Sequence, residues 1–163
     1  MKTRMKKLIS IKSILLLALV LLIVLGSALA AGHEPVSGSV SAIAINAYQF
    51  EGTATLTIGG GEEVKPSFVA TLLEMSENDE GVLHAKVSHT FDFGDGNTFT
   101  TEDKAVMEPV DEFGLYTLNE TLKIISGEGD FEDVSGELHV HGQINFGVTP
   151  AEVSVDIRGA ISR

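Results

Sequence analysis

Two ionisable side chains fall on otherwise apolar faces of predicted strands and are the best candidates for chemistry. In residues 82–93 the period-2 pattern puts His89 in phase with leucine, valine and phenylalanine. In residues 115–125 the same pattern puts Glu120 in phase with Tyr116, leucine and isoleucine. A carboxyl group pointing into a core is costly unless it is paired, and burial raises its pKa. If they face one interior, His89 and Glu120 form an acid–base pair. With Tyr116 they are the candidate ligand-binding residues.

Each of the two also has a plainer structural explanation. The ring nitrogens of His89 can be satisfied by backbone groups within a packed core. A β-bulge that turns Glu120 outward would separate the pair, and such bulges are frequent in antiparallel strands. The sequence favours these plainer explanations, and it assigns no catalytic residue.

His139 and His141 are the weaker candidates, as metal ligands. They are two residues apart in a predicted strand, so both project from one face. A zinc site needs three or four ligands, and the sequence identifies no third. An exposed polar face is therefore expected here. The chain also lacks a phosphate-binding loop, a Gly-x-Ser-x-Gly motif and any cysteine, so we expect no cofactor.

Acidic residues gather at two turns. Asp92, Asp95 and Asn97 surround one predicted hairpin, Glu102 and Asp103 follow it, and residues 128–133 hold four more acids. Oxygen-rich loops suit calcium, but neither run has the ordered ligand spacing of a known calcium loop. We therefore expect solvated acidic turns.

The first thirty residues have the pattern of a secretory signal peptide. Five basic residues lie within residues 2–12, residues 14–25 are apolar without interruption, and Ala28-Leu29-Ala30 is typical of a cleavage site. An uncleaved anchor is the alternative, but the apolar run is shorter than the roughly 20 residues of a spanning helix. The sequence thus predicts a secreted or periplasmic protein, cleaved after Ala30 and not inserted in a membrane.

The charge of the remaining 133 residues bears on partners. They hold 6 basic and 23 acidic residues, a net charge of −17. Such a surface disfavours nucleic acid and anionic lipid as partners and keeps the protein soluble. The oligomeric state stays open. Because the chain has no cysteine, packing must supply the stability of a single domain.

Period-2 patterns dominate residues 40–163, whereas residues 31–39 predict a flexible leader. Residues 68–75 are apolar on both faces, which predicts a strand buried on two sides. Residues 94–97 read Gly-Asp-Gly-Asn and predict a hairpin turn. Seven or eight strands are expected, which favours an all-β barrel or sandwich.

A glycine-and-apolar pattern in the last third carries a family resemblance. Residues 127–138 read GEGDFEDVSGEL and residues 155–161 read VDIRGAI. This pattern resembles the allene oxide cyclase barrel-like and dirigent-like proteins, and the resemblance extends over residues 91–163. It implies a single eight-stranded antiparallel barrel, in which Phe131 and Val134 plug one end. It implies no cyclase activity, because none of that family's catalytic residues can be placed on this chain.

A second motif supports the alternative fold. Residues 91–96 read FDFGDG and residues 114–118 read GLYTL, which is similar to PKD-type immunoglobulin-like domains. That resemblance implies a β-sandwich. An Asp-Gly hairpin after aromatic residues also arises by convergence, since the turn itself requires those residues. The barrel is therefore the favoured fold.

Two functions remain from the sequence. The favoured one is a non-enzymatic barrel that binds a small apolar ligand or a protein partner. The alternative is a cyclase- or isomerase-like enzyme that uses His89 and Glu120 inside the barrel.

Overall fold

The structure, a computed structural model, describes residues 32–163, so the predicted signal peptide lies outside the described residues. Nine strands and one short 3-10 helix follow one another along this part of the chain. They are β1 (His33–Asn46), β2 (Gln49–Ile58), β3 (Glu63–Val64), β4 (Ser67–Glu77), β5 (Leu83–Asp92), β6 (Thr98–Pro109), β7 (Leu115–Glu128), η1 (Gly129–Phe131), β8 (Ser135–Asn145) and β9 (Glu152–Ser162).

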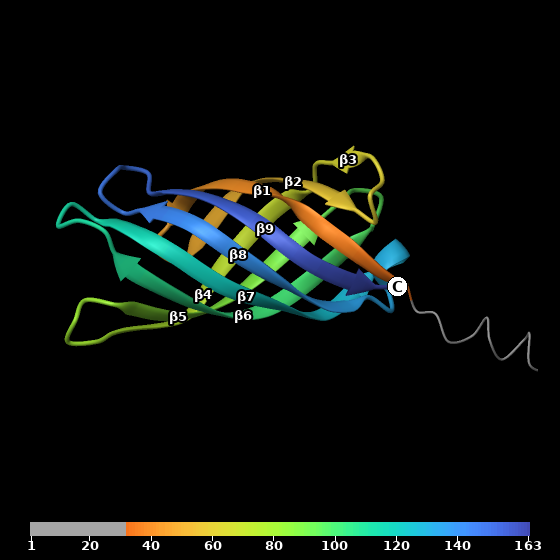
Figure 1. Ribbon diagram of the computed structural model, residues 1–163. Helices are drawn as coiled ribbons and strands as arrows, with labels where there is room; N and C mark the ends of the chain where they lie inside the picture. Colours follow the sequence, from red (N-terminus) through yellow and green to blue (C-terminus); the bar gives the residue numbers. More distant parts are fainter. Residues whose placement is uncertain (1–31) are drawn as a thin grey trace, which may run out of the picture. The chain divides into compact units, whose positions relative to one another are not determined.

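The strands form a closed antiparallel barrel (Figure 1). Neighbours in the sheet follow the order β1-β9-β8-β7-β6-β5-β4-β2, and β1 pairs again with β2 to close the ring. The two-residue strand β3 pairs only with β2 and lies outside this ring of eight. The predicted barrel is confirmed and the alternative sandwich is wrong. Closure leaves no free edge among the eight barrel strands.

The predicted flexible leader is wrong for residues 33–39, which form the first half of β1. Val36 pairs with Ile58 of β2 on one side and with Gly159 of β9 on the other. The side chains of Val36 and Val40 are buried. A strand flanked by two partners satisfies its backbone groups on both edges, and this outweighs the weak strand propensity of glycine and serine.

The expectation that residues 68–75 are buried on both faces is also wrong. Phe68 and Ala70 point into the barrel, but Leu73 and Met75 are 46% and 53% exposed. The pairing of β4 with β5 shifts between Leu72 and Glu74. Leu73, within the shift, does not line the cavity and is exposed to water on the outer face of the barrel, whereas Met75, beyond the shift, lines the cavity at its open end and is exposed there.

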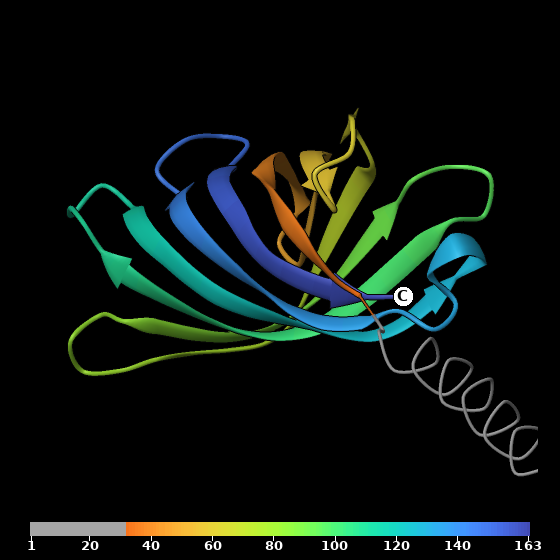
Figure 2. The same ribbon diagram turned by 45° about the vertical axis from the view of Figure 1, so that its right-hand side comes forward.

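One end of the barrel is plugged by aromatic side chains. Phe91 and Phe99 stack with ring centroids 4.7 Å apart, and Phe131 of η1 lies 4.6 Å from Phe93 and 5.5 Å from Phe99. Val134 is buried beside them. Figure 2 shows η1 folded against this end, at the turn between β7 and β8. The predicted role of Phe131 and Val134 as a plug is confirmed.

The opposite end is formed by four connections, which follow β1, β4, β6 and β8. No aromatic plug of the kind built by η1 covers this end among residues 32–163, and we call it the mouth of the barrel. In the same part of the chain, no helix has the length and apolar character required to span a membrane.

Candidate functional site

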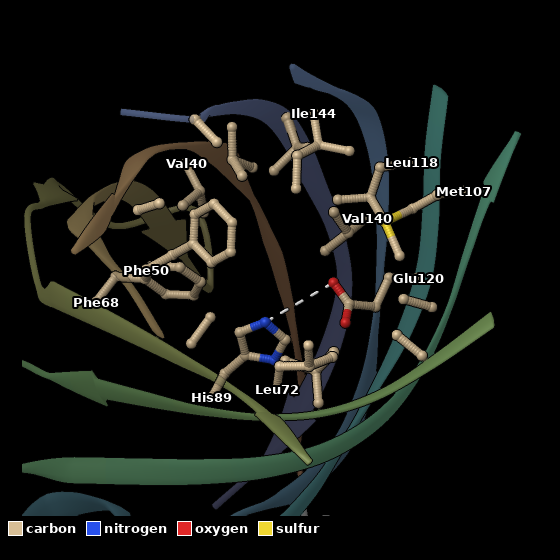
Figure 3. Close-up of a pocket in the computed structure, with 18 of the residues that line it drawn as sticks. Val40, Phe50, Phe68, Leu72, His89, Met107, Leu118, Glu120, Val140 and Ile144 are labelled. Atoms are coloured by element: carbon tan, nitrogen blue, oxygen red, sulfur yellow. Dashed lines mark ion pairs between the residues drawn. The ribbon is translucent and has the colours of Figure 1, made fainter. Parts of the chain in front are cut away.

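The barrel is hollow on the mouth side of the aromatic plug. A cavity of about 230 Å³ extends from Phe91 in the plug to Asn46 and Phe146 at the mouth. Its wall is apolar apart from Asn46, His89 and Glu120. Since Asn46 lies at the outer limit, His89 and Glu120 are the polar groups of the deep wall (Figure 3).

His89 is held by an acidic partner on the neighbouring strand. Its Nδ1 atom donates a hydrogen bond to Oδ2 of Asp103, and both side chains are buried. The ring also stacks on Phe68, with centroids 5.2 Å apart and an interplanar angle of 24°. These two contacts fix the plane of the imidazole and direct its free nitrogen, Nε2, toward Glu120.

Asp103 is fully engaged by donors. The Thr101 hydroxyl donates to Oδ2 at 2.7 Å, and the backbone N–H of Lys123 donates to Oδ1 at 3.0 Å. With His89, this gives three hydrogen bonds to one carboxylate. Both oxygens of Asp103 therefore act as hydrogen-bond acceptors, and this side chain ties together His89, Thr101 and the backbone of β7.

Glu120 has no such support. Its Oε2 atom lies 3.8 Å from Nε2 of His89, which is an ion-pair distance but too long for a hydrogen bond. Its Oε1 atom is the one buried side-chain oxygen or nitrogen within residues 32–163 that has no hydrogen-bond partner. Glu120 is also only 8% exposed. A buried polar atom without a partner is costly, and in native proteins it calls for an explanation.

The protonation states of the pair follow from these surroundings. Burial by itself lowers the pKa of His89, but the charge of Glu120 and the hydrogen bond and charge of Asp103 outweigh it, and the net shift is upward. Burial raises the pKa of Glu120; His89 opposes this and Asp103 adds to it. At a pH below both raised pKa values, His89 is protonated and Glu120 is neutral. The hydrogen bond and charge of Asp103 then remain to hold the proton on His89, because the charge of Glu120 is absent.

The three ionisable groups are close enough to be considered as metal ligands. One atom from each of His89, Asp103 and Glu120 lies within 4.8 Å of the others, the only such triad in the part of the chain described. However, both oxygens of Asp103 and Nδ1 of His89 already make hydrogen bonds. Only Nε2 and the Glu120 carboxyl remain, fewer than the three protein ligands of a catalytic zinc site.

The structure thus places the sequence-predicted pair together and leaves the other candidates apart. Tyr116 is half-buried and packs edge-on against Phe146 at 5.7 Å, but it does not line the cavity. His139 and His141 are exposed on the outside of β8 and belong to no group of three potential ligands within residues 32–163.

Sequence reasoning missed Thr101 and Asp103. The expectation that the acidic run containing Asp103 is solvated is wrong for this residue, which is 3% exposed. The signal was present in the sequence: Phe99, Thr101, Asp103, Ala105 and Met107 alternate in phase, and all five are buried in β6. Thr101 and Asp103 are polar, so the alternation did not read as an apolar face, although this face of β6 points into the barrel.

The mouth carries an apolar rim. Nine of the eleven large hydrophobic residues that are exposed lie on strand ends or connections at this end. Phe113 is 75% exposed and Tyr48 is 67% exposed. The nine residues are Ile43, Ile45, Tyr48, Leu73, Met75, Val110, Phe113, Phe146 and Val148.

No protein-family model matches the chain, and no curated protein matches it significantly in sequence. Function is therefore argued from the cavity and its polar pair.

Proposed function

We propose that the barrel binds a small, mostly apolar ligand inside its cavity, with the polar end of the ligand against His89 and Glu120. The observation that carries the proposal is an apolar cavity with an unpartnered carboxyl group in its deep wall. Apolar pockets with a few convergent polar groups are the usual form of small-molecule sites. A protein partner at the mouth is the other non-enzymatic role, but it would not account for a hollow interior.

The cavity sets the size of the ligand. The volume of the cavity is about 230 Å³. This is below the usual range of drug-sized sites. The exposed apolar residues of the rim continue the apolar wall of the cavity to the surface. A ligand with a longer apolar tail would therefore extend out of the cavity through the mouth.

The proposal places this binding outside the cytoplasm. The pattern of residues 1–30 supports secretion or export to the periplasm, and the absence of cysteine suits a barrel whose stability comes from packing. The resemblance of residues 91–163 to the allene oxide cyclase barrel-like and dirigent-like proteins agrees with this setting and adds no ligand.

A cavity-filling variant tests the proposal. Ala105 lines the cavity and pairs with Glu120 across β6 and β7. We expect Ala105→Leu to occupy ligand volume and to lower the affinity for small apolar probes at least tenfold. Thr121→Leu adds the same side chain on the exposed face of β7 and is the matched control.

Calorimetry with a short-chain ketone would measure both variants, and native mass spectrometry would show any ligand carried through purification. Equal affinity of Ala105→Leu and the parent protein would contradict binding inside the barrel.

A second candidate function is proton transfer within a bound ligand, an isomerase-type reaction. The observation that favours it is the buried line of Asp103, His89 and Glu120, in which one acid orients the imidazole and another faces it across the cavity. For this reaction His89 must first lose its Nε2 proton; that nitrogen can then take a proton from one ligand carbon while the neutral Glu120 carboxyl group returns one to another carbon, so no further reactant is needed.

For that reaction, Glu120→Gln would abolish turnover while leaving the melting temperature equal or higher. Turnover that survives in Glu120→Gln would exclude Glu120 as the proton carrier.

A further inference from the structure

We propose that the polar end of the ligand is a carbonyl oxygen, which accepts hydrogen bonds from His89 Nε2 and from the Glu120 carboxyl group at once. The inference rests on the proposed binding function and names the chemical class of the ligand. It follows from counting donors and acceptors in the deep wall of the cavity.

The first donor is Nε2 of His89, because the imidazole lies between two carboxyl groups, those of Asp103 and Glu120, which favours a ring that carries both protons. Because Nδ1 donates to Asp103, Nε2 is the only ring nitrogen free to interact with a ligand. It lies 3.8 Å from Oε2 of Glu120, too far for a direct hydrogen bond. One oxygen atom placed between the two side chains would be within hydrogen-bond distance of both. Both residues line the cavity, so the ligand can supply that oxygen (Figure 3).

The second donor is the Glu120 carboxyl group. The charges of His89 and Asp103 already cancel, so an ionised Glu120 would leave one uncompensated negative charge in an apolar cavity. Such a charge is expensive, and a buried carboxyl group without donors takes up a proton instead. The neutral carboxyl group then has an O–H with no acceptor among its neighbours. Its partners across the sheet, Ala105 and Val140, are apolar.

His89 Nε2 and the Glu120 carboxyl group are two donors without an acceptor, and this restricts the chemical group that the ligand can place between them. A carbonyl oxygen has two lone pairs, fits both donors and brings no donor of its own. An ammonium group offers only donors and would meet the protonated His89. A carboxylate would add a second negative charge to a cluster in which the charges of His89 and Asp103 cancel. A hydroxyl group can accept, but its own hydrogen must then find an acceptor within an apolar wall.

The test compares two probes with one carbon skeleton, the enone 3-octen-2-one and the alcohol 3-octen-2-ol. For the unmodified protein we expect the enone to bind at least about fivefold more tightly, the value of one additional hydrogen bond. We also expect its ultraviolet absorption band to move to longer wavelength when bound, because hydrogen bonds to the oxygen polarise the conjugated system.

Affinity for the enone should fall as the pH rises, since the donors lose their protons. The titratable groups that face Glu120 inside the barrel are His89 from β5 and Asp103 from β6. An amine ligand would show the opposite trend, because its binding would displace a proton from Glu120.

Two variants separate the role of the carboxyl group from its charge. Glu120→Gln retains a neutral N–H donor, so enone binding should stay within about threefold of the parent and the band shift should persist. Glu120→Leu removes the donor, so binding should weaken about fivefold and the band shift should shrink. Glu137→Gln, on the exposed face of β8, is the control.

The outcomes are distinct. Equal affinities for enone and alcohol without a band shift would overturn the carbonyl assignment and leave apolar binding intact. No binding of either probe to the unmodified protein would overturn both proposals. Since the probe comparison uses the unmodified protein, it does not depend on the folding of any variant.

Discussion

His89 Nε2 lies 3.8 Å from Glu120 Oε2, although the two residues stand on β5 and β7, which are not neighbours in the sheet. Adjacent strands are about 4.8 Å apart, so two long side chains can meet over the strand between them only on the concave side of a curved sheet. That strand is β6, and it supplies Asp103 to the far side of the imidazole. The curvature of the barrel therefore assembles the cluster from three consecutive strands.

Asp103→Asn should destabilise the protein by about 3 kcal/mol, the loss typical when one partner of a buried ion pair is removed. The amide would also place an N–H₂ group against donors that now point at a carboxylate. In addition, the pKa of His89 should fall, because its hydrogen-bonded anion is lost.

Urea unfolding would measure the stability, and NMR titration of the histidine ring would measure the pKa. Asp156→Asn, on the exposed face of β9, is the control and should change neither. An unchanged His89 pKa in Asp103→Asn would contradict the role given to Asp103.

Glu120→Leu should stabilise the protein, by about 1–3 kcal/mol at pH 7. The substitution removes a buried carboxyl oxygen that has no partner and leaves the His89–Asp103 pair balanced. Glu120→Gln should fall between the parent and the leucine variant. Chemical denaturation of the ligand-free protein provides the measurement. A large loss of stability in both variants would mean that the carboxyl group has a partner inside the barrel.

Stability should decrease as the pH rises above about 4.5, and Glu120 and His89 contribute to this decrease with the same sign. Glu120 has an unfolded pKa near 4.5 and a higher folded one, so the folded state holds the extra proton and stability is lost as the pH rises above 4.5. His89 contributes stability that is complete below 6.5 and is lost as the pH rises through its raised folded pKa.

Each extra proton gives a slope of up to about 1.4 kcal/mol per pH unit. Urea unfolding at several pH values would measure it, and Glu120→Gln should reduce the slope because one titrating group is gone. If the slope of the unfolding free energy against pH is the same in Glu120→Gln as in the parent, the pH dependence arises from the acidic surface and not from Glu120.

Gly127→Ala should damage the plug and leave the mouth intact. A Cβ atom at this position would collide with the carbonyl oxygen of Phe131 and approach Cγ1 of Val134 to 2.9 Å. Overpacking of this kind costs about 1–3 kcal/mol. We expect a lower melting temperature by calorimetry with probe affinity retained. Gly32→Ala meets nothing within 4 Å and should have no effect.

Most of the fold could be predicted from the sequence because most inward-facing positions of the strands are apolar and recur at every second residue. The closing element could be predicted from the glycine-hinged corner, where Gly129 has a φ of +63° and Phe131 is buried. The predictions that failed concern single segments and not the fold as a whole. The glycine- and serine-rich start of β1 resembles a linker in composition, and only its pairing with two strands makes it part of the sheet.

The site could be predicted in part. His89 and Glu120 stood out because each interrupts a run of apolar residues in phase. Asp103 did not, because Thr101 beside it on the same face also breaks the apolar pattern of β6. The contact of His89 with Asp103 depends on the pairing register of β5 and β6, which places His89 opposite Thr101. A single sequence contains no direct record of such a register.

The pairing of His33 with Ser162 sets the first and last strand residues side by side at the plugged end, remote from the mouth. Arg163 reinforces this seam through an ion pair of 2.6 Å with Glu34 and a position over the ring of Phe131. The first residue of β1 and the last residue of β9 therefore both lie at the closed end of the barrel, opposite its mouth. A protein fused after Arg163, or a surface that binds the chain there, would leave the mouth unobstructed. A ligand could then enter and leave the cavity of the attached protein.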